Sequence, residues 1–225
     1  MFRHTQLAAF MVGLQDARVV FTDETLKPDI ETVATVTSQA IGAESADRIV
    51  VVGVGTVDTA TNSVSSVTIN GVSATIIDQT TQSSAGIFSV AALCYARVPT
   101  GTSVSIVVTW ADQVFRTHIG VWALYGVGTL VPHDFGKSAV DPGAVANMDV
   151  PAGGVAVGYS AMYDTSLGGT YTWSNITEDF DVDGAGTNEQ YSGASIARQA
   201  AQVASTITAD PSAASAVGTV VASWR

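Results

Sequence analysis

The strongest structural signal in the chain lies in residues 67–76, Val-Thr-Ile-Asn-Gly-Val-Ser-Ala-Thr-Ile. Apolar and polar side chains alternate on both sides of the central Asn70-Gly71 pair. Alternation with a period of two is typical of a β-strand that buries one face. An Asn-Gly pair readily adopts the positive φ angles of a two-residue hairpin turn. The stretch therefore predicts an antiparallel β-hairpin that turns at Asn70 and Gly71.

The same β pattern extends through the chain from residue 31 onward, where short apolar runs are separated by Gly, Pro, Asn, Asp and Ser. Val and Thr are abundant, and branched side chains suit the pleated, half-buried surface of a sheet. We expect strands at 32–38, 48–56, 65–70, 72–77, 86–96, 103–110, 117–126, 154–162, 170–174, 191–199, 204–208 and 216–224. This pattern predicts an all-β fold, an antiparallel jelly-roll-like β-sandwich that uses all of these strands.

The two halves of the chain resemble each other at a spacing of roughly one hundred residues. Four stretches match in the same order: 49–53 with 155–158, 66–70 with 170–174, 88–91 with 191–194, and 119–122 with 217–220. We interpret this as a possible duplication with halves at about 45–126 and 152–225, joined by a crossover at 127–151. Chance similarity between strands of similar composition stays open as the alternative.

Residues 1–30 differ in character from the rest. Leu7, Phe10, Met11 and Leu14 have a helix-like spacing, and the polar stretch 22–28 follows them. We expect an N-terminal arm in front of a β-sandwich domain at 31–225. Two roles stay open for this arm: it lies over its own domain, or it anchors the protein to another subunit.

Charge and cysteine content exclude several classes of protein. The formal net charge is −11, with nine Lys and Arg against twenty Asp and Glu, whereas a nucleic-acid binder needs a basic surface. The apolar stretch 7–14 is too short to span a bilayer, so we expect no membrane insertion. Cys94 is the single cysteine, which excludes an intrachain disulfide, and we expect it in the core.

Candidates for nucleophilic catalysis are few. His118 lies in an alternating strand, where we expect it to point outward or to meet a polar partner in the core. His133 follows Pro132 and is expected in a turn. Ser160 stands in Gly-Tyr-Ser-Ala-Met, which lacks the last glycine and the following helix of a nucleophile elbow. We therefore expect no catalytic residue and no enzyme activity.

An acidic stretch follows Trp173. Asp179, Asp181 and Asp183 stand at alternate positions before Gly184, like the first half of a calcium-binding loop. The residue that should close an EF-hand is Gln190 instead of Glu, which excludes that motif. We expect a solvated acidic loop and no cofactor, with a looser calcium site at these three aspartates as a weaker hypothesis. A polysaccharide hydrolase that uses Glu178, Asp179 or Asp181 is a further alternative.

Aromatic side chains surround the Gly168-Gly169 turn. Tyr163, Tyr171 and Trp173 flank this turn and adjoin the acidic stretch. Aromatic rings pack against the apolar faces of sugars, so these three residues are the candidates for glycan contact. The alternative interpretation places strand-borne aromatic residues in the core.

The C-terminal part of the chain carries a resemblance. Four features carry this resemblance: Trp173-Ser174, the acidic pair Glu178-Asp179, the strand Tyr-Ser-Gly-Ala-Ser at 191–195, and the final Val-Val-Ala-Ser-Trp-Arg at 220–225. In these features residues 45–225 resemble the jelly-roll-like virion proteins of tailed bacteriophages and of phage-like gene transfer agents. The resemblance implies a structural protein on a particle surface, and it implies no shared catalytic residues.

The low charge content and the lack of a catalytic constellation predict a non-enzymatic structural protein. The resemblance implies that it is a spike, fibre or decoration subunit on the surface of a phage or gene-transfer-agent particle. The expected partners are capsid or other virion proteins, further copies of this chain in a homo-oligomer, and host surface polysaccharide. Strands poor in lysine leave their edges unguarded, which favours burial by neighbours. The expected location is the virion, assembled in the bacterial cytoplasm. The alternative is a secreted carbohydrate-binding module or adhesin.

Overall fold

A computed structural model describes residues 16–164, 168–184, 188–212 and 216–225. Within them the chain is all-β and antiparallel, as the sequence predicts. Sheet A contains, in spatial order, β1 (Arg18–Lys27), β9 (Thr117–Tyr125), β3 (Ile49–Asp58), β7 (Ile87–Arg97) and β6 (Thr75–Ser84). Sheet B contains β2 (Glu31–Ala40), β8 (Ser103–Val114), β4 (Val64–Ile69) and β5 (Val72–Ser73).

The second half of the chain forms two more sheets. Sheet C contains β10 (Asp134–Ser138), β17 (Ala216–Trp224), β12 (Gly154–Tyr163), β15 (Glu189–Arg198) and β14 (Thr177–Asp183). Sheet D contains β11 (Gly143–Val150), β16 (Gln202–Pro211) and β13 (Tyr171–Ser174). No helix with the length and hydropathy of a membrane span occurs among the described residues.

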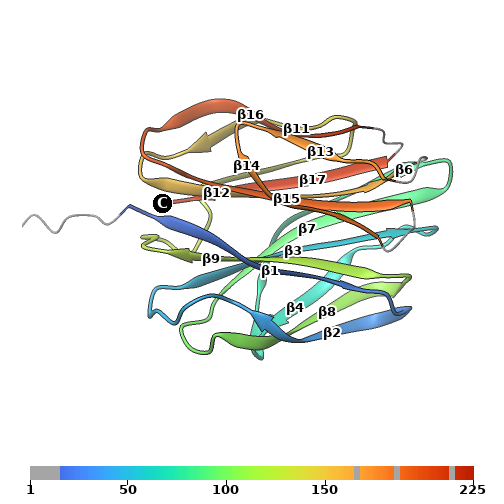
Figure 1. Ribbon diagram of the computed structural model, residues 1–225, viewed down its shortest axis with the longest axis horizontal. Helices are drawn as coiled ribbons and strands as arrows, with labels where there is room; N and C mark the ends of the chain where they lie inside the picture. Colours follow the sequence, from blue (N-terminus) through green and yellow to red (C-terminus); the bar gives the residue numbers. More distant parts are fainter. Residues whose placement is uncertain (1–15, 165–167, 185–187, 213–215) are drawn as a thin grey trace, which may run out of the picture.

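The four sheets stack as layers in the order B, A, C, D (Figure 1). One apolar core lies between sheets B and A and includes Val52 and Ile106. A second lies between A and C and includes Val51 and Val157. A third, with Ile207, lies between C and D. The strands therefore form two sandwiches packed back to back, and the expectation that they fill one sandwich is corrected.

The layering explains two kinds of strand sequence. β3 and β12 belong to the inner sheets A and C, and nearly every residue in them is buried because both faces are covered. β8 belongs to the outer sheet B, and its buried positions alternate along most of its length because one face meets solvent. Cys94, on β7, is fully buried in the core between A and B, and burial raises the pKa of its thiol to about 12.

The predicted hairpin is confirmed. Asn70 and Gly71 have φ angles of 53° and 77°, and β4 pairs with β5 across this turn. The second strand of the hairpin is short, because the chain leaves sheet B after Ser73 and enters β6 of sheet A. The strand expected at 72–77 is thus divided between two sheets.

Both halves of the chain have the same topology. In sheet C the strands β10, β17, β12, β15 and β14 hold the places that β1, β9, β3, β7 and β6 hold in sheet A. In sheet D, β11, β16 and β13 hold the places of β2, β8 and β4. The four pairs of stretches matched in the sequence fall on β3 with β12, β4 with β13, β7 with β15, and β9 with β17, which are equivalent strands.

Three segments differ from their expected form. The described part of the expected arm 1–30 includes β1, an edge strand of sheet A whose side chains Val19 and Phe21 pack on the core between A and C. The helix-like spacing at 7–14 lies outside the described residues. The crossover 127–151 contains β10 and β11, and the expected acidic loop is strand β14. These strands carry many polar residues and lie at sheet edges, so their pairing comes from neighbours far away in the sequence.

The interface between sheets A and C, called the seam below, depends on rings that lie against glycines. A Cβ atom on Gly53 of β3 would lie 2.3 Å from Cδ2 of Tyr159, and one on Gly55 would lie 2.5 Å from the Tyr159 hydroxyl oxygen. A Cβ on Gly120 of β9 would lie 2.7 Å from the Phe180 ring. These contacts are shorter than van der Waals separation, so the two sheets approach this closely only because the side chain is absent.

We expect the substitution Gly53→Ala to lower the free energy of unfolding by about 1–3 kcal/mol, because the added methyl group forces Tyr159 or a sheet to move. Gly128→Ala is the control, since its Cβ would meet its nearest atom, the Arg225 carbonyl oxygen, at an ordinary 3.5 Å. Urea unfolding of both variants measures the difference. Equal stability of the two variants would contradict the packing described for the seam.

Candidate functional site

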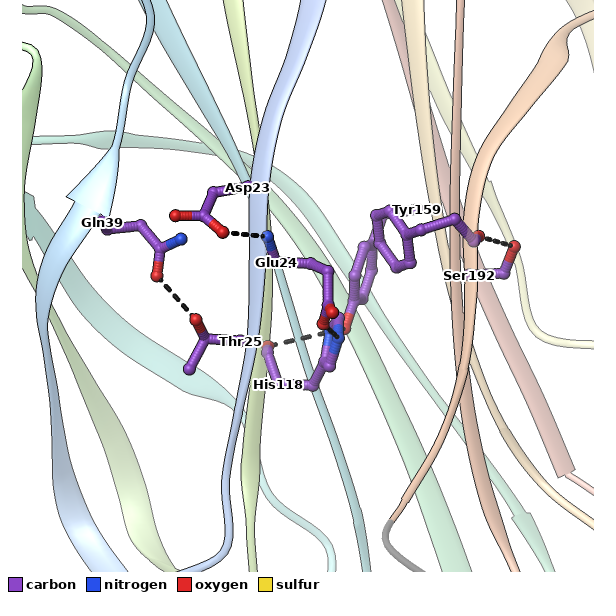
Figure 2. Close-up of polar contacts among 8 residues, drawn as sticks. Asp23, Glu24, Thr25, Gln39, His118, Tyr159 and Ser192 are labelled. Carbon is purple, nitrogen blue, oxygen red and sulfur yellow. Dashed lines mark hydrogen bonds and ion pairs between the residues drawn. The ribbon is translucent and has the colours of Figure 1, made fainter.

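A chain of hydrogen bonds crosses the seam at His118 (Figure 2). His118 lies on β9, and its side chain is fully buried. Its Nε2 is 3.2 Å from Oε2 of Glu24 on β1, and its Nδ1 is 2.9 Å from the hydroxyl oxygen of Tyr159 on β12. A carboxylate can only accept, so Nε2 carries the proton, and Nδ1 accepts from the tyrosine hydroxyl. The neutral imidazole thus joins the first half of the chain to the second.

Burial lowers the pKa of His118, and this effect outweighs the opposing attraction of Glu24. The hydrogen bond from His118 lowers the pKa of Glu24, which keeps that carboxyl group ionised. Burial also raises the pKa of Tyr159 well above its ordinary value, so its hydroxyl keeps the proton that it donates. The protonation states of the three groups are therefore mutually consistent at neutral pH.

A second set of polar contacts continues from the His118 ring. The imidazole stacks on the ring of Tyr191, with centroids 4.6 Å apart and an angle of 6° between the planes. The Tyr191 hydroxyl donates to Oε2 of Glu189 at 3.1 Å, and Arg116 Nη1 donates to Oε1 of the same carboxylate at 2.6 Å. Arg116 and Glu189 belong to different halves of the chain. The whole network therefore connects the two sandwiches.

The burial of His118 and Tyr159 indicates that their hydrogen bonds have a structural role. A Glu, a His and a Tyr in hydrogen-bond contact have the residue types of an acid–base site. His118 and Tyr159 are both fully buried, so a substrate cannot reach the hydroxyl. Of the two environments expected for His118, the structure shows the polar partner in the core. Its signal in the sequence is a histidine at an inward position of an otherwise apolar strand.

A second buried ionisable group, the Arg48 guanidinium, binds the backbone of two loops. Arg48 is fully buried, and its guanidinium group donates five hydrogen bonds to backbone carbonyl oxygens. The acceptors lie in two loops, at residues 42–43 and 98–101. All five N–H donors of the guanidinium are used, so this cation is held for loop geometry. The sequence analysis did not single it out.

The predicted acidic residues are engaged in hydrogen bonds along β14. Asp179 Oδ2 accepts from the Trp122 indole N–H at 2.7 Å, and burial raises the pKa of this aspartate despite that bond. Asp181 accepts from the backbone N–H of Tyr171 and from the side chain of Gln190, both at 2.8 Å. Asp183 is exposed at the end of the strand, and Glu178 is exposed near its beginning. Among the described residues no group of three or more His, Cys, Asp or Glu side chains is arranged to hold a metal ion.

The three candidates for glycan contact have different environments. Tyr171 is 5% exposed and stacks with Trp173, and its hydroxyl accepts from Ser160 Oγ at 3.1 Å. Trp173 is half-buried against the apolar cores beside sheet D, and its indole N–H donates to Ser192 Oγ at 2.8 Å. These two rings therefore pack inside the protein. Tyr163 lines a surface pocket.

The segment around β10 exposes apolar side chains. Val131 is 65% exposed and Phe135 is 51% exposed, and Leu130 and Val140 are also exposed. We call these four residues the 130–140 surface. Val131 and His133 also line a pocket of about 600 Å³ together with Asp16 and Arg225. β10 is an edge strand of sheet C, and among the described strands it pairs with β17. The sequence analysis placed this segment in a crossover and did not identify its apolar surface.

Comparison of the chain with models of protein families, with curated proteins and with solved structures finds no match.

We expect His118→Gln to lower the free energy of unfolding at pH 7.5 by about 1–3 kcal/mol, because Tyr159 and Glu24 lose a well-placed partner. The advantage of the wild type should shrink as the pH falls below about 6.5, the ordinary histidine pKa. In that range the unfolded chain binds a proton that the buried imidazole resists, so lowering the pH favours unfolding until the folded-state pKa is passed.

Urea unfolding of both proteins between pH 5 and 7.5 measures this difference. His133→Gln, at an exposed position, controls for the loss of one histidine. An advantage of the wild type that stays constant across the whole pH range would contradict the assigned protonation state.

Proposed function

We propose that this protein is a non-enzymatic structural subunit on the surface of a phage or gene-transfer-agent particle, as a spike, fibre or decoration protein. The observation that carries the proposal is the 130–140 surface, an apolar region beside an edge strand of a four-layer β body. Exposed apolar surface of this kind is typical of protein–protein contact sites. The sequence resemblance over residues 45–225 supports the kind of particle.

The geometry suits a role in assembly. β10 is an edge strand of sheet C, so a neighbouring subunit can cover both this edge and the exposed side chain of Phe135. Lys137 on β10 donates to Asp78 Oδ1 at 2.8 Å and to the Gln79 carbonyl oxygen at 3.0 Å, both on β6. These two hydrogen bonds from Lys137 hold β10 against sheet A. A partner that binds an ordered surface loses less conformational entropy on association.

The partners in this proposal are further copies of the chain and capsid or other virion proteins, and the site of assembly is the bacterial cytoplasm. Mass spectrometry of phage-like particles from the source organism tests it directly. We expect peptides of this chain in the purified particles at a fixed copy number relative to the major capsid protein. Recovery of the protein only from the medium, with none in particles, would contradict the proposal and favour a secreted carbohydrate-binding module.

We expect the purified protein to form a closed, symmetric oligomer at micromolar concentration. The double substitution Val131→Ser and Phe135→Ser should shift it toward monomer, because both exposed side chains lose apolar contact area. Val203→Ser is the matched control, since Val203 is an exposed valine on β16 of sheet D. Sedimentation velocity measures the state of each protein, and a monomeric wild type would contradict the assembly role.

A further inference from the structure

A second pocket opens where the seam reaches the surface, and it is separate from the 130–140 surface. Its volume is about 310 Å³. It lies between the ends of β3 and β12, the beginnings of β7 and β15, and the turn that joins β8 to β9. Both halves of the chain contribute to its walls, which include Asp58, Ile87, Phe115, Tyr163, Asn188 and Glu189.

Asp58 lines this pocket, and its carboxylate has an unfilled hydrogen-bonding position. Its side chain is 5% exposed, and its Oδ1 accepts from the backbone N–H of Thr59 at 2.6 Å. Its Oδ2 is buried and receives no hydrogen bond from any described residue. A buried carboxylate oxygen without a donor lowers the stability of the fold, because its hydrogen bonds to water are lost and no protein hydrogen bond replaces them. Binding of a donor at this position would remove that cost.

The charges around the pocket do not balance. The Glu189 carboxylate is matched by the Arg116 guanidinium and also accepts from the Tyr191 hydroxyl. Burial raises the pKa of Glu189, Arg116 opposes this rise, and the nearby charge of Asp58 adds to it. Asp58 itself forms no ion pair with a described residue. Asp58 therefore has no cationic partner among the described residues, in a pocket with largely apolar walls.

We propose that this pocket binds a primary ammonium group carried on a short apolar stem, with an ammonium N–H donating to the Asp58 carboxylate. The stem lies against Ile87, Phe115 and Tyr163, and both aromatic rings favour a nearby cation. A calcium ion fits less well, because it requires six to eight oxygen ligands and these walls are mainly hydrocarbon. An uncharged alcohol of the same size fills the apolar space and leaves the carboxylate charge unmatched.

The test uses the full-length, ¹⁵N-labelled protein titrated with n-butylammonium chloride, at ionic strength held constant with NaCl. Constant ionic strength matters because a protein of net charge −11 attracts any cation weakly. We expect saturable shifts of the backbone amide signals of Thr59, Phe115 and Asn188. The dissociation constant of n-butanol, the neutral probe of similar shape, should be higher by about tenfold or more.

Asp58→Asn should weaken n-butylammonium binding by about tenfold or more, because the amide side chain removes the negative charge. Asp183→Asn is the matched control, since Asp183 is exposed on β14 and does not line the pocket. Phe115→Ala, at a turn residue that is 40% exposed, is a second variant that should weaken binding if Asp58→Asn fails to fold.

Glucosamine is the second amine probe, and it should bind more weakly than n-butylammonium because its hydroxyl groups do not match the apolar walls. Four results would overturn the inference: no saturable binding of n-butylammonium, tighter binding of glucosamine than of n-butylammonium, equal affinity for n-butanol and n-butylammonium, or unchanged affinity in Asp58→Asn. None of these results bears on whether the protein is part of a particle, which the mass spectrometry decides.

Discussion

Back-to-back packing of sheets A and C is the constraint on which the rest of the structure depends. Each inner sheet has an outer sheet on one face and the other inner sheet on its second face, so its strands are apolar on both sides. The seam closes because Tyr159 and Phe180 lie against glycines of neighbouring strands. A side chain at Gly53 or Gly120 would push sheets A and C apart and loosen the apolar core between them.

Aromatic packing without polar contacts would leave the relative position of the two sheets weakly specified. His118 donates to Glu24 within sheet A and accepts a hydrogen bond from the Tyr159 hydroxyl of sheet C. The bond to Tyr159 crosses between the layers and is directional, so it is satisfied in one arrangement of the two sheets. The Arg116–Glu189 ion pair adds a second fixed point where the seam approaches the surface. The polar contacts of the seam therefore set the register between two sandwiches of the same topology.

The two regions proposed for function lie at the surface of the protein. The 130–140 surface lies where the two halves of the chain join, and residues of both halves form the walls of the pocket at Asp58. The proposed assembly role uses the first, and the proposed ammonium site uses the second. A body built from two similar sandwiches can in this way have two surfaces with different chemistry.

Local sequence determined the elements whose signal lies within a few residues. Asn70-Gly71 specified its turn because only local backbone angles matter there, and the long apolar runs specified the inner strands because both of their faces are buried. The order of the matched stretches also indicated equivalent strands. The edge strands β1, β10, β11 and β14, the layering and the partners of His118 were decided only by the tertiary structure. Each of these depends on contacts between residues distant in the chain. Edge strands rich in polar residues lack the apolar periodicity from which such pairing could be predicted.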